Sequence, residues 1–340
     1  MKKIFFGILA MAAFAACSNE EQIAAPQGEA IAFGNAFVDN SVRAGEAVDP
    51  SYAPDGITQF NVYGSVNGVN IFNGNLVEKN SAAYGAAWTL TGAEQYWING
   101  GSYIFDAVVD GTPVSLDAAG LPTALSYDVT TQKDILHTRV ETVGKPTTNN
   151  GIVTFTFSHL LSKVKFTVEN KTAAAATNYR YTVTDIKLTN VNTKGDCAVP
   201  NHEWSNLTEA GEYAIANMVV PSNSTVECAN EVLLIPSTDD TDAQKVGISF
   251  KLNIEMSDGR VDGEGALIWT TIPTTDAQKT YTEVMTLEAG KAYNFKATVS
   301  LGDKIQFTAT EMNDWENGNT NDSNADTVLD NVPLVTTPAN

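Results

Sequence analysis

The chain has 340 residues, 43% of them hydrophobic, and its 40 acidic against 20 basic side chains give a net charge of −20 at pH 7. So acidic a chain repels the phosphate backbone of nucleic acids, and no basic stripe offsets that repulsion, which excludes nucleic acid as a partner. The length and apolar content fit two packed domains.

The N-terminus predicts a lipoprotein export signal. Lys2 and Lys3 precede an apolar run that ends on small residues and is too short for a transmembrane span, which needs about 20 residues. Removal of the signal peptide, residues 1–16, would leave Cys17 as the lipidated, palmitate-carrying first residue. Phe14 stands where the usual motif prefers Leu, so a plain secretory signal is the alternative.

The mature chain is expected to begin with a polar tether, residues 17–30. Loss of the signal peptide removes two of the basic residues and none of the acidic ones, which leaves a net charge of −22. Glu20 and Glu21 resemble acidic signals that send lipoproteins of some anaerobic Gram-negative bacteria to the outer face of the outer membrane; a solvated linker is the other interpretation. We expect a cell-surface lipoprotein of the outer membrane.

Beyond the tether, nearly every periodic stretch has period two, the pattern of half-buried β-strands. Apolar and polar residues alternate at 60–66, 103–109, 246–256 and 293–301. Tight turns are predicted at the Asn-Gly pairs 67–68, 73–74 and 99–100. Many short strands joined by such turns predict an all-β chain of tandem antiparallel β-sandwich domains.

A domain boundary is expected near residue 158. Apolar side chains occupy odd positions from Val153 to Phe157 and even positions from Leu160 onward. A β-bulge near His159 would cause this change of face within one sheet, because an extra residue reverses every later side chain. We favour a chain that passes from one sandwich to the next. The resulting division is an N-terminal domain at 31–158, a C-terminal domain at 159–318 and a tail at 319–340.

The sequence contains no constellation for catalysis. His137, His159 and His202 each stand without a Cys, Asp or second His at metal-ligand spacing, and no nucleophile elbow, phosphate loop or dinucleotide motif occurs. His159 is expected to form structural hydrogen bonds. The carboxylates are scattered, so no glycosidase-like pair stands out. We therefore predict that the protein is not an enzyme and holds no metal or cofactor.

Three features each allow two interpretations. Cys197 and Cys228 could pair in an exported protein or remain free buried thiols. The Asn- and Asp-rich run 313–326 offers oxygen ligands of the kind Ca²⁺ takes, but its spacing fits no EF-hand loop and favours a solvated linker. The tryptophans could include a sugar-stacking platform, although core packing accounts for most tryptophans of a β-sandwich. They are Trp88, Trp97, Trp204, Trp269 and Trp315.

Three blocks resemble the fimbrillin (Mfa-like) family of type V pilus proteins: TFTFSHLLSKVKFTVEN at 154–170, LEAGKAYNFKATV at 287–299, and residues 305–315. The lipoprotein motif and an early arginine fit the same family, so the resemblance reaches about residue 318. It implies two transthyretin-like β-sandwich domains and a subunit of surface fimbriae in cell adhesion, as stalk, anchor or tip. The implied partners are other fimbrial subunits, host or bacterial surface ligands including glycans, and the outer membrane through the lipid anchor.

The resemblance also implies an assembly mechanism. In the family, a trypsin-like protease cuts after an arginine, and the lost N-terminal strand is replaced by the extended tail of another subunit, a form of β-strand addition. By resemblance, Ile31, Phe33 and Phe37 belong to the displaced strand and Arg43 is the processing site. An exposed linker arginine that is never cut is the alternative for Arg43.

The C-terminal tail is the candidate donor strand. Val328, Val332 and Leu334 share one face, Asp330 interrupts the series, and Pro333 confines the segment to a sheet edge. The segment either donates a strand to a neighbour or packs back on its own domain. We predict a fimbrial subunit or fimbrillin-like surface lipoprotein. The alternative is a glycan-binding surface lipoprotein of a nutrient-uptake system, which exposed coplanar aromatic rings would favour.

Overall fold

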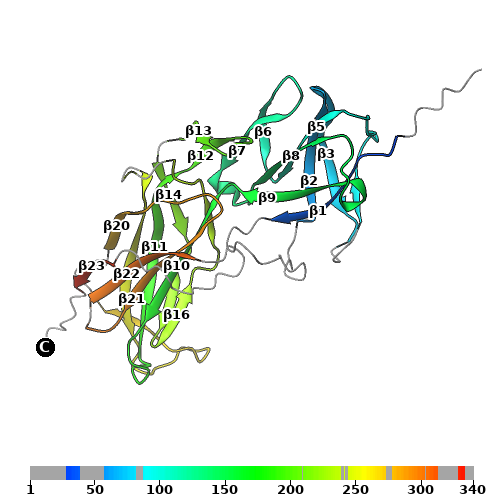
Figure 1. The fold of residues 1–340 in the computed structure, drawn as a ribbon. Coiled ribbons are helices and arrows are strands. Elements are labelled where there is room, and N and C mark those ends of the chain that lie inside the picture. Colours follow the sequence, from blue (N-terminus) through cyan, green and yellow to red (C-terminus); the bar gives the residue numbers. More distant parts are fainter. Residues whose placement is uncertain are drawn as a thin grey trace, which may run out of the picture.

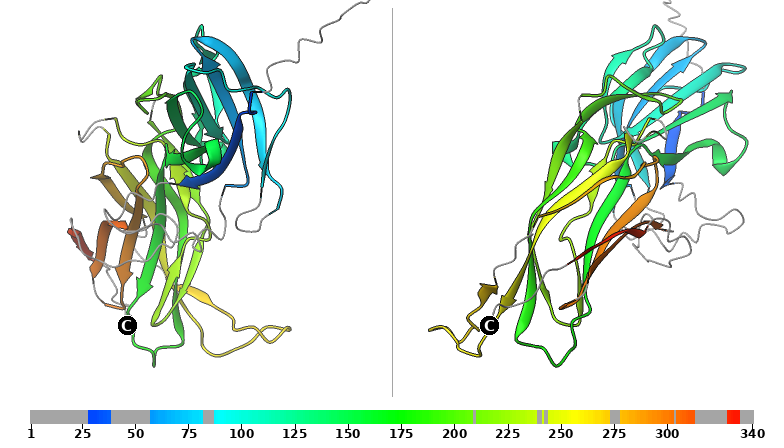
Figure 2. Two further views of the ribbon diagram at one scale, coloured as in Figure 1. Left: turned by 45° about the vertical axis from the view of Figure 1, so that its right-hand side comes forward. Right: turned by 90° about the vertical axis from the view of Figure 1, so that its left-hand side faces the viewer.

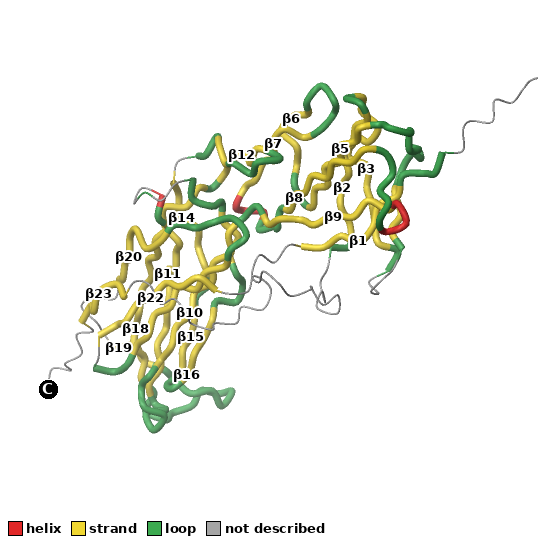
Figure 3. The backbone as a smooth tube through the Cα atoms, in the orientation of Figure 1, coloured by secondary structure: helices red, strands yellow, loops and turns green. Residues whose placement is uncertain are grey.

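The structure is a computed structural model that describes residues 28–38, 57–81, 87–208, 210–238, 241, 244–272, 278–302, 304–312 and 328–333. Within these residues the chain forms β-strands and short 3-10 turns, among them η2 (Val129–Thr131) and η3 (Asn149–Gly151), and no α-helix (Figure 3). Consequently, the described part holds no helix that could cross a membrane. The predicted all-β class is confirmed.

Seven strands of the first half form one sheet in the order β1-β9-β8-β5-β2-β3-β4 (Figure 1). These strands are β1 (Ala32–Val38), β2 (Gln59–Val66), β3 (Val69–Lys79), β4 (Trp88–Leu90), β5 (Ser102–Val109), β8 (Leu136–Val143) and β9 (Ile152–His159). The alternating stretches 60–66 and 103–109 are β2 and β5. Neighbours in this sheet run antiparallel, except that β1 and β9 run parallel.

The seven-stranded sheet curves around an aromatic core, which brings its two end strands together. A Cβ added at Gly34 of β1 would lie 3.1 Å from the Ile152 side chain on β9 and 3.5 Å from the Trp88 side chain on β4. The lack of a side chain at this position lets the end strands approach closely. The core inside the curve contains seven large apolar side chains that are fully or almost fully buried: Phe33, Phe60, Phe72, Tyr103, Phe105, Phe155 and Phe157.

One of the three predicted turns is wrong. The pair Asn73-Gly74 lies inside β3, where Val62 pairs with Asn75 and Tyr63 pairs with Asn73. Gly74 is left without a partner and forms a β-bulge, for which its φ of 75° suits a glycine. The pairs at 67–68 and 99–100 do form turns.

The second half is a sandwich of two sheets, seen below the first half in Figure 1. One sheet has the order β16-β10-β21-β22-β23, with β17 also paired to β10. The other has the order β14-β11-β18-β19, with β15 paired to β11 and β20 to β18. The strands of the first sheet are β10 (Ser162–Asn170), β16 (Ser224–Glu227), β17 (Val232–Leu234), β21 (Ala292–Val299), β22 (Lys304–Met312) and β23 (Val328–Pro333). Those of the second are β11 (Tyr179–Asn192), β14 (Ala210–Ile215), β15 (Met218–Pro221), β18 (Val246–Met256), β19 (Thr270–Ile272) and β20 (Gln278–Met285).

Aromatic side chains join the two sheets of this sandwich. The ring centroids of Phe166 on β10 and Phe250 on β18 are 5.2 Å apart, and those of Tyr281 on β20 and Phe307 on β22 are 4.2 Å apart. The strand predicted at 246–256 is β18, and that at 293–301 is β21. Parallel pairing occurs here too, between β10 and β21.

A fourth sheet is shared between the two halves of the chain. Its order is β13-β12-β7-β6, and its strands are β6 (Thr112–Leu116), β7 (Pro122–Asp128), β12 (Lys194–Ala198) and β13 (Trp204–Ser205). Leu125 and Tyr127 on β7 are buried in the same core as the second sandwich. The halves lie end to end (Figure 2), and this sheet ties them together.

The change of face near His159 coincides with a change of sheet. Strand β9 ends at His159 in the seven-stranded sheet, and β10 begins at Ser162 in the second sandwich. A bulge within one sheet is therefore not the cause. Strand β7 nevertheless pairs with β12 from beyond this crossing, and β6 and β13 extend the same sheet on either side, so the two halves are interlocked.

Candidate functional site

The first candidate site is the seat of β1. Its backbone pairs with β9 in a parallel register from Ala32 opposite Ile152 to Val38 opposite Phe157. At its other edge the described backbone hydrogen bonds involve residues just before the strand: the Ile31 N–H donates to the Gln95 carbonyl, and the Glu29 carbonyl accepts from the Trp97 N–H. Strand β1 thus has one partner strand along its length, and a single pairing holds it in the sheet (Figure 1).

The side chains of this first segment complete the core of the first half. Ile31 and Phe33 are 4% and 5% exposed. The Phe33 ring lies 5.3 Å from that of Phe72, 5.4 Å from that of Phe105 and 5.7 Å from that of Phe155. Such ring pairs contribute about 0.5–1.5 kcal/mol each beyond the burial of area. The pairing of its backbone with one strand therefore holds the segment weakly, whereas the burial of its side chains in the core holds it strongly.

In the N-terminal part of the chain, three predicted site positions lie partly or wholly outside the described residues. The backbone of Phe37 pairs with Thr156, but its side chain is outside the described residues. Cys17 and Arg43 also lie outside them. Arg43 belongs to residues 39–56, which connect the end of β1 to the next described residue.

The second candidate site is the sheet edge formed by β22, on which the tail lies. The backbone of β23 pairs antiparallel with β22, with Val332 opposite Ile305, Leu329 opposite Phe307 and Val328 opposite Thr308. Pro333 is the last residue of this edge strand, and a proline within a sheet is tolerated at such an edge. Leu334 lies outside the described residues. The pairing of β23 with β22 corresponds to the alternative in which the tail packs back on its own domain.

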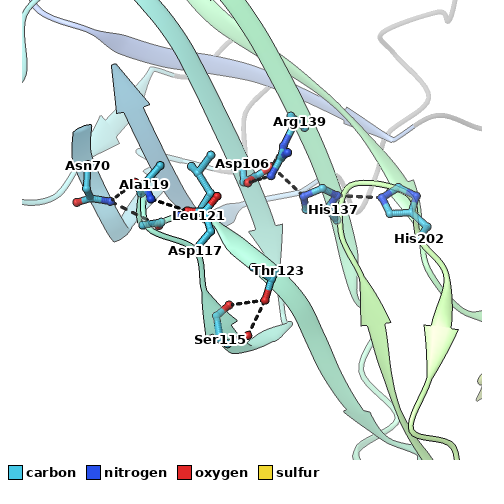
Figure 4. A network of polar contacts seen from close by, with 11 residues as sticks. Asn70, Asp106, Ser115, Asp117, Ala119, Leu121, Thr123, His137, Arg139 and His202 are labelled. Atoms are coloured by element: carbon cyan, nitrogen blue, oxygen red, sulfur yellow. Dashed lines mark hydrogen bonds and ion pairs between the residues drawn. The ribbon is translucent and has the colours of Figure 1, made fainter. Parts of the chain in front are cut away.

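A third site brings together residues that are far apart in the sequence. His137 on β8, Asp106 on β5, Arg139 on β8 and His202 between β12 and β13 form a chain of polar contacts (Figure 4). In the sequence each histidine stands isolated, and 65 residues separate His137 from His202. The one local signal was Asp106 itself, a lone carboxylate within the apolar stretch Tyr103–Val109.

The remaining histidine, His159, lies beside a carboxylate. His159 Nδ1 lies 2.7 Å from Asp134 Oδ2, which fits a structural role. Among the described side chains, no group of three or more His, Cys, Asp or Glu residues could hold a metal ion. The Asn- and Asp-rich run 313–326 lies outside the described residues.

The disulfide alternative is not realised, and both cysteines are free buried thiols. Cys228 Sγ accepts a hydrogen bond from the Phe166 N–H at 3.2 Å, whereas Cys197 is buried on β12 of the shared sheet. Burial raises the pKa of Cys197 to about 12 and also raises the pKa of Cys228. Both thiols therefore stay protonated and inert at neutral pH.

The tryptophans do not form an exposed platform in the described part of the chain. Trp88, Trp97, Trp204 and Trp269 are all half-buried. The first three pack against the two cores, and the Arg180 guanidinium lies 4.2 Å from the ring centroid of Trp269. The arrangement that would favour sugar stacking is absent among these four rings.

These features define an all-β protein in which the first strand completes the core of a sheet from its edge. Residues 53–315 match the family model described as fimbrillin-like. Since this match covers most of the chain, the protein belongs to the fimbrillin-like family, and the resemblance seen in the sequence is confirmed. A search of curated proteins finds no match.

Two solved structures of fimbrial proteins are similar to this chain. A fimbrial protein from Bacteroides vulgatus is 14% identical, with a TM-score of 0.54 over 84% of this chain and 99% of that chain. The fimbrial anchor protein Mfa2 from Porphyromonas gingivalis is 10% identical, with a TM-score of 0.39 over 82% of this chain and 95% of that chain. At 14% identity, the first likeness shows that the fold is shared.

Proposed function

We propose that this protein is a non-catalytic fimbrial subunit that acts in adhesion and is built into surface fimbriae by exchange of its first strand. The observation that carries the proposal is the seat of β1, where Ile31 and Phe33 fill the core while one strand, β9, holds the backbone. Membership of the fimbrillin-like family supports the same role.

Loss of the first strand would create a defined acceptor groove. Removal of the chain up to Arg43 would leave β9 with an unpaired edge and would uncover the rings of Phe72, Phe105 and Phe155. Each apolar side chain removed from such a core forfeits about 1.5–3 kcal/mol. A strand from another subunit can supply both the ladder hydrogen bonds and the apolar side chains.

The proposed donor is the tail of a second copy, with Val328, Val332 and Leu334 as the side chains that enter the groove. In the free subunit the backbone of this tail lies on β22 of its own sandwich. The donor must therefore leave an edge of its own domain before it fills the groove of a neighbour. Donor and acceptor therefore cannot combine until the tail has left β22 and the first strand has left its groove.

The proposed anchor is lipid on Cys17, which would hold the precursor at the outer membrane until cleavage after Arg43 releases it into fimbriae. Replacing Cys17 by Ala should abolish fatty-acid labelling and release the precursor from the membrane fraction, because no other expected anchor remains. A variant that stays in the membrane fraction and still incorporates labelled fatty acid would contradict the lipid anchor.

The assembly step is tested on the purified precursor without its signal peptide and lipid. Brief treatment with a trypsin-like protease should cut selectively after Arg43 and yield larger species in size-exclusion chromatography. Three variants should remain monomeric: Arg43→Gln, a chain that lacks residues 326–340, and the double variant Val332→Asp with Leu334→Asp, which would place charge in an apolar groove. The first is the control for cleavage and the other two are controls for the donor.

Two results would contradict strand exchange. One is a precursor cut after Arg43 that forms no larger species. The other is the persistence of larger species when residues 326–340 are missing. Equal cutting at Arg43, Arg139, Arg180 and Arg260 would count against a dedicated processing site, because the strands that carry Arg139 and Arg180 should be protected from the protease.

A further inference from the structure

Two histidines from different halves of the chain meet at the junction. His137 lies on β8 of the seven-stranded sheet and is 1% exposed, and His202 lies in the turn 199–203 between β12 and β13 of the shared sheet. His137 Nδ1 is 2.9 Å from His202 Nε2, and the two rings are nearly perpendicular, at 89° (Figure 4). This distance is that of a hydrogen bond between two imidazole nitrogens.

The other nitrogen of His137 contacts a carboxylate that is already neutralised. Asp106 is fully buried and accepts from Arg139 Nε at 2.8 Å and from Arg139 Nη2 at 2.7 Å, while His137 Nε2 lies 3.1 Å from its Oδ1. Burial would raise the pKa of Asp106, but the hydrogen bonds from Arg139 and His137 hold it below its usual range. The single negative charge is thus matched by Arg139.

The contact between the rings tolerates one proton and not two. A neutral imidazole has one donor and one acceptor nitrogen, so one proton between Nδ1 of His137 and Nε2 of His202 makes a hydrogen bond. One added proton goes to an outer nitrogen and keeps this bond, whereas a second added proton makes both rings cations, sets one N–H against the other at 2.9 Å and places two positive charges beside a carboxylate that Arg139 already neutralises. Burial, and secondly the charge of His137, lower the pKa of His202 to about 4, in keeping with this geometry.

The charged groups around the pair do not supply a second counter-charge. The electrostatic influence on His202 comes from His137, and that on Asp106 comes from His137 and Arg139. Glu141 and Asp117 act on Arg139. Glu203 follows His202 in its turn and is exposed, and the His159 and Asp134 pair lies where β9 meets β8. A second proton on the ring pair is therefore uncompensated.

We propose that the His137 and His202 contact is a proton-operated clamp between the two halves of the molecule, closed at neutral pH and open in mild acid. When it opens, the turn 199–203 moves away from β8, because His202 is only half-buried and its ring can reach water, whereas His137 is enclosed. The halves remain joined, since the pairing of β7 with β12 and the two hydrogen bonds between the Gln132 side-chain amide and the Leu233 backbone are made by backbone and amide groups, which carry no titratable proton.

The test is hydrogen–deuterium exchange of the full mature chain at pH 7.5 and pH 4.5, expressed as protection factors so that the intrinsic pH dependence of exchange is removed. The reporting amides are those of the turn, where the Val199 N–H donates to Thr123 and the His202 N–H donates to Ala198. We expect their protection in the wild type to fall at least ten-fold at pH 4.5, while that of β7 and β12 stays within two-fold.

Two variants separate the clamp from general acid loosening. His202→Asn should show the same protection of the turn at both pH values, because Asn tolerates the left-handed φ of 59° at this position and does not titrate. His159→Gln removes a different histidine of the junction and should keep the wild-type response. A turn whose protection is unchanged by pH in the wild type, or an equal response in His202→Asn, would overturn the proposal.

Discussion

Replacement of Phe33 by Ala is the most direct measure of how firmly β1 is seated. The ring is 5% exposed and lies within 5.3–5.7 Å of three other aromatic rings. Truncation of a buried phenylalanine to alanine destabilises a protein by about 3–5 kcal/mol, through lost burial and the cavity that remains. Since β1 ends a sheet and has one partner strand, its backbone can shift to close part of that cavity, which favours the lower part of this range.

The assay is urea unfolding of the uncut precursor followed by tryptophan fluorescence, to which Trp97 contributes because its ring lies 6.1 Å from that of Phe105. Val143→Ala is the matched control, since Val143 is 75% exposed in the same sheet and its truncation should change the free energy of unfolding by less than about 0.5 kcal/mol. A loss below about 1 kcal/mol for Phe33→Ala would refute the seating of β1 in the core.

Three further outcomes are expected. Relative to His202→Asn, the wild type should lose about 1–3 kcal/mol of unfolding free energy as the pH falls from 6.5 towards 4, because the folded-state pKa of His202 is about 4 and the unfolded chain binds the proton first. Urea unfolding at pH 7.5, 6 and 4.5 measures this loss. The same dependence of unfolding free energy on pH in the wild type and in His202→Asn would contradict it. Asp106→Asn should cost about 3–5 kcal/mol, because it leaves Arg139 without its counter-charge; a loss below about 1 kcal/mol in the same assay would show that the pair is dispensable. Cys197 and Cys228 should resist a thiol reagent in the folded protein and react together after unfolding, as mass spectrometry would record; labelling of either in the folded state would contradict their burial.

The sequence predicted those strands that have one apolar and one polar face. It did not predict features that depend on which strand lies beside which. The stretch Val246–Met256 alternates strictly, and it is β18 with the same bounds. The Asn73-Gly74 pair was predicted as a turn but forms a β-bulge. An Asn-Gly pair is compatible with either structure, and only the pairing of β3 with β2 shows which one forms. The parallel pairing of β1 with β9 leaves no local signature, because period two states which face a residue takes and not which strand lies beside it.

The candidate sites divide in the same way. Ile31 and Phe33 were assigned to an early strand from their alternation and the family resemblance, and both are buried in the core. The contact of His137 with His202 depends on the pairing of β7 with β12, which sets the turn 199–203 against β8. No spacing rule covers residues that a shared sheet brings together. Asp106 alone carried a local sign, as a carboxylate flanked by apolar residues on a strand.

The shared sheet also dictates the order in which the molecule can fold. Strand β7 closes its far edge only when β12 arrives, so a nascent chain must emerge to about residue 198 before Leu125 and Tyr127 are covered. Strand β1 likewise cannot pair until β9 has been synthesised. Pairings so distant in sequence slow folding, because loop closure must precede the contacts that stabilise it. A fragment that stops at residue 158 would keep an unpaired strand and an uncovered apolar surface, and is therefore expected to aggregate when expressed alone.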